Sequence, residues 1–266
     1  MNIFVLTKQV PDTSEIKIDP VKNTLIREGV ESILNPYDAC ALEKALQIKD
    51  KNPEVKIYAI AMGPMQAEKM LRDCLAVGCE DAFLVTDRKF GGSDTLATSY
   101  ILTNAIKHIE GIVGKADLVF AGLQAIDGDT AQVGPEIAEQ LDLPQSTYAI
   151  DAKVEDGKLL ITRQLDLGNQ IVESQMPALV TFTKTDDLRF PNMKTKLKAR
   201  KAEIRQITLA DMPEIEVERL GLKGSPTRVK KTYTPSVMKE GLIIEGKDAD
   251  TAVKELVDAL ENAKLF

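Results

Sequence analysis

The first half of the chain alternates short apolar runs with segments whose apolar residues recur every three or four positions. Residues 3–7, 55–62, 82–86 and 116–121 have the length and composition of buried strands. Strands that alternate with helices predict parallel pairing through right-handed crossovers. We therefore expect an α/β fold, a doubly wound and mainly parallel sheet with helices on both faces.

Four helices are predicted between and after these strands, each marked by a capping or helix-breaking residue. The predicted starts are Asn35 followed by Pro36, Gly63 followed by Pro64, Ser93 or Asp94 as N-cap, and a position near Asp129. Parallel sheets of this kind bind ligands where the strands end. The segments to inspect are therefore residues 8–12, 62–64, 87–94 and 122–130.

After Pro144 the pattern changes to short alternating runs at residues 147–154, 159–164, 171–173 and 178–183. Turn residues at 156–157 and 168–169 predict an antiparallel meander that extends the sheet. Beyond residue 184 no sustained alternation follows until a helix at about residues 248–264. We expect a compact domain over residues 1–185 and an arm over residues 186–266, since a long irregular tail is typical of a segment that wraps a partner.

Composition excludes several classes of protein. The formal net charge of −7 argues against a nucleic-acid role. No run approaches the roughly 20 apolar residues of a membrane span, and the first residues lack a signal-peptide pattern, so a cytoplasmic location is expected. Cys40, Cys74 and Cys79 are read as buried core thiols, and His108 as a surface residue of a helix. With one histidine and no paired cysteines, neither a metal site nor a catalytic triad is expected.

The most informative segment is residues 118–135, a strand followed by a glycine-bearing turn and a helix start. Free N–H groups at a helix N-terminus favour anions, and Gly122 and Gly128 permit close approach of a ligand. The segment matches neither standard phosphate-binding fingerprint. Asp127 or Asp129 is expected to cap the helix or to accept a ribose hydroxyl. Local geometry alone leaves a nucleotide loop and an ordinary capped turn equally open.

The pattern Gly-x-Gln-Ala-Ile-Asp-x-Asp-x-x-Gln at residues 122–132 resembles the adenine-nucleotide loop of electron-transfer flavoprotein β subunits. The resemblance extends over the whole chain, through residues 5–11, 35–38, 63–64, 71–78 and 188–201. It implies nucleotide contacts at Leu6, Asn35, Pro36, Tyr37, Asp38, Met62, Gly122, Gln124, Ala125, Ile126, Asp127, Asp129, Thr130, Ala131, Gln132 and Val133.

Within that family, housekeeping members hold structural AMP in this subunit, whereas electron-bifurcating members hold FAD that accepts hydride from NADH. Residues 127–135 and 90–98 are similar to the bifurcating group. The resemblance therefore implies FAD, with AMP as the alternative, and adds Asp94, Thr95 and Thr98 to the cofactor contacts. An ordinary helix N-cap preceded by two flexible glycines remains the alternative interpretation of residues 90–98.

A basic run, residues 194–201, stands out in this acidic protein, and its alternation predicts an extended, solvated edge. In the family, the segment just before it docks on a dehydrogenase through an exposed apolar residue flanked by charge. The matching anchor is Met193, flanked by Lys194 and Lys196. Leucine is common at this position in the family, and methionine suits a transient contact.

The resemblance implies a β subunit that works only with an α subunit carrying its own FAD. Such a complex moves electrons between NADH, a low-potential acceptor such as ferredoxin, and a flavin-dependent dehydrogenase. The flavin carries the chemistry, so no catalytic side chain is assigned. Residues 1–185 would hold the nucleotide, and residues 186–266 would form a recognition loop and an arm on the α subunit. A nucleotide-binding sensor or ATP-hydrolysing protein of similar fold is the alternative from another class.

Overall fold

The computed structural model describes residues 1–12, 17–18, 25–26, 31–230, 241, 243–244 and 248–265. Its parallel strands are β1 (Asn2–Thr7), β6 (Lys56–Met62), β7 (Asp81–Val85), β8 (Leu118–Gly122), β9 (Gln145–Glu155), β12 (Ala178–Phe182) and β13 (Arg205–Ile207). The strands β10 (Lys158–Leu165) and β11 (Gly168–Ser174) pair antiparallel. Together they form a nine-stranded sheet in the order β11-β10-β9-β12-β8-β1-β6-β7-β13. This confirms the predicted doubly wound, mainly parallel sheet with an antiparallel extension.

Two small antiparallel pairs lie outside this sheet. The strand β2 (Gln9–Pro11) pairs with β5 (Ser32–Leu34), and β3 (Lys17–Ile18) pairs with β4 (Leu25–Ile26). The first pair directly precedes the first helix.

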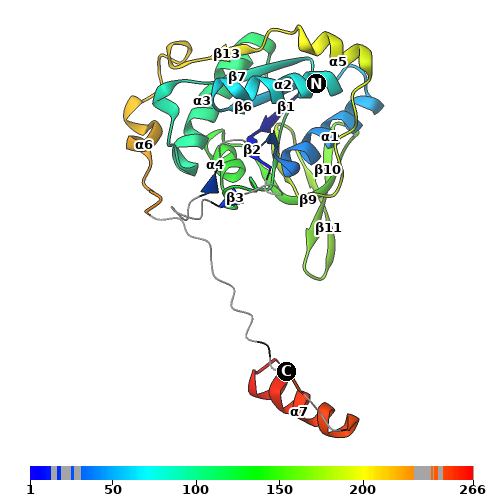
Figure 1. Cartoon of the computed structure of the whole chain (residues 1–266). Coiled ribbons are helices and arrows are strands. Elements are labelled where there is room, and N and C mark those ends of the chain that lie inside the picture. The colour runs from blue at the N-terminus through cyan, green and yellow to red at the C-terminus, as the bar shows by residue number, and fades with distance from the viewer. Residues whose placement is uncertain are drawn as a thin grey trace. The chain divides into compact units, whose positions relative to one another are not determined.

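The helices are α1 (Pro36–Lys51), α2 (Glu68–Val77), α3 (Thr95–Val113), α4 (Val133–Gln140), α5 (Met193–Arg200), α6 (Gly221–Gly224) and α7 (Ala249–Asn262). Short 3-10 turns are η2 (Met65–Ala67), η3 (Arg88–Phe90), η4 (Leu209–Asp211) and η5 (Val217–Arg219). Figure 1 shows the helices α1 to α6 together with the sheet.

The sheet has a separate apolar core on each face because alternate strand residues point to opposite sides. Ile3 and Val5 of β1 pack in the core that includes α1 and α2. Phe4 and Leu6 pack in the other core, with α3 and α4. All three cysteines are buried and free, as expected, and His108 is half-buried on α3.

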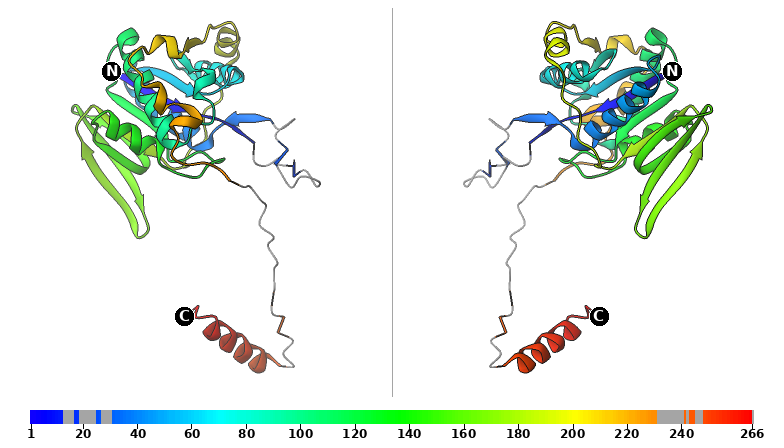
Figure 2. Two further views of the ribbon diagram at one scale, coloured as in Figure 1. Left: turned by 90° about the vertical axis from the view of Figure 1, so that its left-hand side faces the viewer. Right: turned by 90° about the vertical axis from the view of Figure 1, so that its right-hand side faces the viewer.

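Two strand predictions need correction. The run at residues 178–183 was assigned to an antiparallel meander, but β12 lies parallel to both β8 and β9, because the chain crosses back after the β10–β11 hairpin. The hairpin itself protrudes from the sheet (Figure 2). Its outer turn falls at Asp166 and Leu167 instead of residues 168–169, since Gly168 already pairs with Leu165.

Two helix predictions also need correction. The fourth helix begins at Val133 and not near Asp129, because Asp129 and Ala131 have φ values of 50° and 53°, which a right-handed α-helix does not accommodate. The basic run at residues 194–201 is not an extended edge. It forms α5, capped by the Asn192 side chain, which accepts a hydrogen bond of 2.9 Å from the Thr195 N–H.

The chain consists of two compact units, Met1–Lys230 and Lys231–Phe266. Residues 186–230, which we had expected in the arm, supply α5 on one face of the first unit and β13 at the edge of its sheet. The second unit contains α7, which has no buried residue and exposes Val253, Leu256 and Val257 at helical spacing. The predicted helix at residues 248–264 is confirmed.

Candidate functional site

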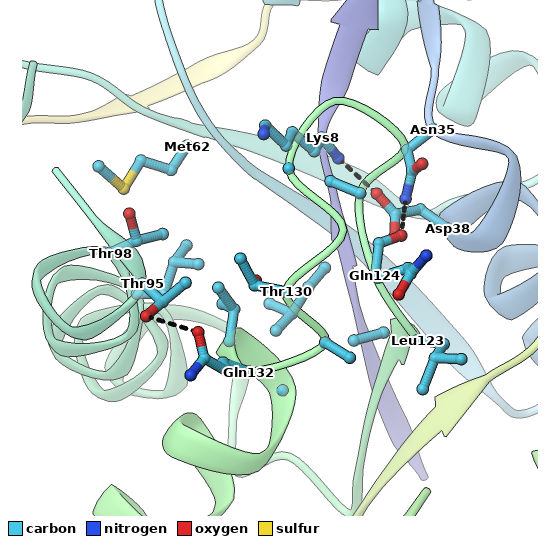
Figure 3. A pocket seen from close by; sticks show the side chains of 18 of the residues that line it. Lys8, Asn35, Asp38, Met62, Thr95, Thr98, Leu123, Gln124, Thr130 and Gln132 are labelled. Atoms are coloured by element: carbon cyan, nitrogen blue, oxygen red, sulfur yellow. Dashed lines mark hydrogen bonds between the residues drawn. The ribbon is translucent and has the colours of Figure 1, made fainter. Parts of the chain in front are cut away.

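A cavity of about 330 Å³ lies at the carboxyl ends of β1, β6 and β8 (Figure 3). The chain runs from β1 to β6 on one side of it and later returns to β8 on the other side. The cavity therefore occupies the switch point of the sheet, where doubly wound folds bind ligands. Its volume is at the lower end of the usual range for small-molecule sites, about 300–1,000 Å³.

The start of α1 holds the loop that follows β8. The Asp38 carboxylate, 7% exposed, accepts hydrogen bonds from the N–H groups of Lys8 (2.8 Å) and Gly122 (3.1 Å). The Asn35 side chain donates to the Gln124 carbonyl (2.8 Å) and accepts from the Ile126 N–H (3.2 Å). Asn35 was predicted to cap α1, but its side chain makes no cap hydrogen bond. Both polar side chains instead position the loop across the sheet.

Gly122 is required by this close packing. A Cβ atom at this position would lie 2.3 Å from Asp38 Oδ1 and 2.6 Å from Tyr37 Cβ. These distances are far below van der Waals contact. Gly128, in contrast, lines the cavity and would place a Cβ with nothing within 4 Å.

The two acidic residues of the loop have partners of their own. Asp127 forms an ion pair with Lys8 (2.7 Å), and Asp129 accepts a hydrogen bond from the Gln124 side chain (2.8 Å). Neither caps α4, whose N-cap position is held by Gln132, so that part of the sequence interpretation is wrong. Asp129 is thus held within the loop, whereas Asp127 is paired with Lys8 directly after β1.

The opposite wall of the cavity is the first turn of α3. The N-cap of α3 is Asp94, whose side chain accepts from the Ala97 N–H (3.1 Å). The Thr95 hydroxyl lies 3.3 Å from Gln132 Oε1 and 3.2 Å from Glu136 Oε1, so it joins α3 to the start of α4. Small side chains with hydroxyl groups, Ser93, Thr95 and Thr98, therefore face the cavity on this side.

The structure brings most of the predicted contacts together in one place. Those that line the cavity are Leu6, Asn35, Asp38, Met62, Asp94, Thr95, Thr98, Gln124, Ala125, Thr130, Ala131, Gln132 and Val133. Those that do not line it are Pro36, Tyr37, Gly122, Ile126, Asp127 and Asp129. Cofactor contact at each of these positions stays a prediction.

Lys8, Ser93, Leu123 and Gly128 also line the cavity and fall within the strand-end segments that the sequence indicated. Four further lining residues were not named as contacts, namely Thr7, Leu102, Ala121 and Gly134. Most of them adjoin a predicted residue in the sequence. Leu102 lies one helical turn after Thr98, so helical periodicity along α3 could have found it.

The residues present fit an adenine nucleotide. The first N–H groups of a helix have no intrahelical acceptor. In the described part of the chain, no acceptor occurs for those of Val133 and Gly134, which line the cavity. The positive φ angles of Asp129 and Ala131 are of the kind that occur at ligand-binding loops. Apolar walls from Leu6, Met62 and Leu102 would accept the faces of planar rings.

Asp38 gives the site a distinct pH response. Burial raises the pKa of this carboxyl to about 7, although hydrogen bonds from Asn35, Lys8 and Gly122 favour its ionised form. Between the ordinary value of 3.8 and about 7, the folded protein keeps a proton that the unfolded chain has lost. The stabilisation by this proton is complete below about pH 4 and is lost as the pH rises toward 7.

We expect the unfolding free energy of the wild type to fall by about 2 kcal/mol between pH 5 and pH 8, relative to Asp38→Asn. The variant carries no ionisable group at position 38. The contributions of all other ionisable groups to the pH dependence therefore cancel when the two proteins are compared. Urea unfolding of both proteins at intervals across this pH range measures the difference. Parallel profiles for the two proteins would contradict the prediction.

A second surface lies around α5. Phe190 is 96% exposed, Met193 73% and Leu197 53%. Met193 and Leu197 are four residues apart, so they lie on one face of the helix. Lys194 and Lys196 are exposed, and neither has an acidic partner within the described chain. We call Phe190, Met193 and Leu197 the α5 patch.

Within the described segments, no helix has the length and apolar character of a membrane span. The same segments contain no group of three or more His, Cys, Asp or Glu side chains arranged to hold a metal ion.

Comparison with known proteins identifies the family. The family model of the electron transfer flavoprotein domain matches residues 22–212. The chain is 48% identical over 251 residues to the electron transfer flavoprotein subunit beta of Megasphaera elsdenii, with 93% of each chain covered. It is 46% identical over 268 residues to subunit CarD of the caffeyl-CoA reductase-Etf complex of Acetobacterium woodii, with 100% of each covered.

A third relative is the acryloyl-CoA reductase electron transfer subunit gamma of Anaerotignum propionicum, 41% identical over 266 residues, with 98% of each chain covered. These matches extend over nearly the whole chain and confirm the resemblance read from its loop and strand-end motifs. The chain belongs to the electron transfer flavoprotein family, as one of its β subunits.

Proposed function

We propose that this chain binds FAD and serves as the β subunit of a bifurcating electron-transfer flavoprotein. In this proposal NADH is the hydride donor. The complex divides electrons between a low-potential acceptor such as ferredoxin and, through the FAD of the α subunit, a flavin-dependent dehydrogenase. When bound, FAD would supply the redox chemistry, and the protein would supply binding and orientation.

The observation that carries the proposal is the extent of the cavity. It continues from the loop after β8 to the first turn of α3, so it has a nucleotide-binding wall and a second wall of small side chains. AMP would need only the first wall. Ser93, Thr95 and Thr98 would present small side chains with hydroxyl groups to the remainder of a dinucleotide. The names of two relatives, from caffeyl-CoA and acryloyl-CoA reductase systems, support a role in a reductase complex.

The chain's own residues would act by binding and orientation. Asn35 and Asp38 hold the loop after β8, and the N–H groups of Val133 and Gly134 are placed for an anionic group. Lys8 lines the cavity and forms an ion pair with Asp127, which offsets the negative charge of this loop residue. No protein nucleophile or acid–base pair is required for this role.

The test is a count of released cofactors. The chain is co-expressed with its α subunit, the purified heterodimer is denatured, and FAD and AMP are measured by absorbance and mass spectrometry. We expect two FAD and no AMP per heterodimer, together with bleaching of the flavin absorbance when NADH is added. One FAD with one AMP, and no reduction by NADH, would instead make the protein a housekeeping carrier.

Two surfaces are proposed to bind protein partners. The α5 patch, with Lys194 and Lys196 beside it, would dock on the dehydrogenase. In the second unit, Val253, Leu256 and Val257 of α7 form an exposed apolar stripe that would pack on the α subunit. A cytoplasmic location for the complex is part of the same proposal.

A further inference from the structure

A segment from the last part of the first unit packs against α3 and the loop that leads into it, both of which supply residues to the cavity lining. We call residues 216–227 the strap. Its first residue, Glu216, donates its N–H to the Tyr100 hydroxyl of α3 (3.0 Å). The Arg219 guanidinium carbon lies 3.7 Å from the centroid of the Tyr100 ring, which is cation–π geometry. The strap is thus attached to the outer side of α3.

The middle of the strap contacts the loop that leads into α3. Gly221 has a φ of 58°, and a Cβ there would lie 2.3 Å from the Lys89 carbonyl oxygen and 3.0 Å from that of Gly91. The backbone of the strap therefore approaches residues 89–91 closely. This loop continues into Ser93, which lines the cavity.

The end of the strap is joined to the cavity wall through one carboxylate. Asp94 Oδ1 accepts from the Ala97 N–H within α3, and Oδ2 accepts from the Thr227 N–H (2.9 Å) and the Thr227 hydroxyl (2.8 Å). The Asp94 N–H in turn donates to the Ser225 hydroxyl (2.8 Å), which donates to the Gly221 carbonyl (2.7 Å). Ser225 is 5% exposed, so this connection is partly shielded from water.

Asp94 is suited to this junction. Burial opposes its ionisation, but the hydrogen bonds from Ala97 and Thr227 outweigh it and lower the pKa of the carboxyl. The Asp94 carboxylate is therefore anionic at neutral pH. It accepts hydrogen bonds both from α3, through Ala97, and from the strap, through Thr227. Thr227 itself is exposed, does not line the cavity and lies four residues before the second unit begins.

We propose that Asp94 and Thr227 couple occupancy of the nucleotide cavity to the position of the strap, and through it to binding of the second unit by a partner subunit. The inference rests on the proposed function, in which the cavity holds an adenine nucleotide. A ligand bound against the first turn of α3 restrains the position of Asp94. The hydrogen bonds from Thr227 to the Asp94 carboxylate then restrain Thr227. Because linkage is reciprocal, a partner that holds the chain after Thr227 strengthens nucleotide binding by the same factor. Thr227 is a positioning residue in this arrangement.

The coupling is measured by trypsin cleavage of the heterodimer after Arg228 and Lys230, which are exposed and directly follow the strap. Cleavage is followed by mass spectrometry in protein stripped of cofactor and after addition of FAD or, separately, AMP. We expect the ligand to slow cleavage of the wild type by about 5-fold or more. Thr227→Val should lose this protection, and Thr227→Ser, which keeps the hydroxyl, should retain it.

Thr208→Val is the matched control, because the Thr208 hydroxyl makes the same kind of contact with Asp211 (2.7 Å) outside the cavity lining. It should be protected like the wild type. Equilibrium dialysis with the same two ligands gives the second readout, in which Thr227→Val should bind about 3- to 10-fold more weakly.

Equal protection and equal affinity in Thr227→Val and the wild type would overturn the coupling and leave the proposed function intact. A wild-type heterodimer in which this chain binds neither FAD nor AMP would overturn both. The two failures are therefore distinguishable in one set of samples.

Discussion

Under the proposed function, replacing Gly122 with alanine is expected to weaken binding of FAD, or of AMP, by about 100-fold or more, because the added methyl group cannot be accommodated. Its Cβ would overlap Asp38 Oδ1 and lie 2.7 Å from the Asp38 backbone nitrogen. Asp38 cannot move aside without releasing the N–H groups of Lys8 and Gly122. Gly122 cannot retreat either, because it ends β8 and pairs with Phe182.

The overlap is therefore relieved by displacing the loop after β8 or the first turn of α1, and both line the cavity. Equilibrium dialysis of the heterodimer with each ligand measures the loss. Urea unfolding of the same samples should show a destabilisation of about 2–3 kcal/mol. Unchanged affinity in Gly122→Ala would mean that the cavity is not the nucleotide site.

Gly128→Ala is the matched control for stability, since it adds the same methyl group to the same loop. No atom lies within 4 Å of its Cβ, and its φ is not in the left-handed region. Its unfolding free energy should stay within about 0.5 kcal/mol of the wild type. Equal destabilisation of both variants would show that the loop rejects any side chain, and that the contact with Asp38 is not the cause.

The strands and the first three helices were predictable because local pattern and tertiary role agree there. The runs that became β1, β6, β7 and β8 are buried on both faces of the sheet, so they appear as uninterrupted apolar stretches. The Asp94 cap was likewise visible because its hydrogen bond to Ala97 spans only three residues. Doubly wound sheets bind ligands at the carboxyl ends of their strands, so the predicted strand ends alone indicated where the cavity lies.

Other features depend on partners far away in the sequence. Asn35 has the sequence signature of a cap, but its amide bonds to Gln124 and Ile126, about 90 residues away. Asp129 looks like the start of a helix, but the backbone there takes positive φ, which composition does not distinguish from a cap. Resemblance to a family supplied the residues that local pattern could not select.

The basic run shows a different kind of failure. Alternating lysines at Lys194, Lys196 and Lys198 suggested a strand edge, but lysine is also a good helix former. The Asn192 cap and the burial of Ala199 on one side of the segment favour the helix over the strand. β13 was missed because a three-residue edge strand carries too short a pattern to detect.

Arg189→Ala is expected to lower the unfolding free energy by about 3 kcal/mol, because it leaves a buried carboxylate without its partner. The Arg189 guanidinium binds both oxygens of Glu43, with the shortest distance 2.8 Å, and also Asp50 at 2.8 Å. The Arg189 backbone N–H donates to Glu43 as well (3.1 Å). Glu43 is 7% exposed, so water cannot replace the lost contacts fully.

The same contacts attach the segment before the α5 patch to α1. These hydrogen bonds raise the pKa of Arg189 above its ordinary value and lower that of Asp50, in agreement with a strongly bound fork. Three residues before Arg189, Asp186 pairs with Lys44 of α1 at 2.6 Å. Since Phe190 directly follows Arg189, the variant should also expose residues 186–192 to faster proteolysis.

Urea unfolding of Arg189→Ala is compared with Lys158→Ala, which breaks an ion pair of similar length with Glu173 (2.7 Å) on the exposed hairpin. The hairpin pair is more than half exposed on both sides, so its loss should cost less than about 1 kcal/mol. Arg189→Lys separates the effect of the positive charge from the effect of the guanidinium geometry. A lysine keeps the charge but cannot bind Glu43 and Asp50 together in a planar fork, so it should recover only part of the loss. Full recovery by lysine would show that charge alone, and not the fork geometry, holds this segment on α1.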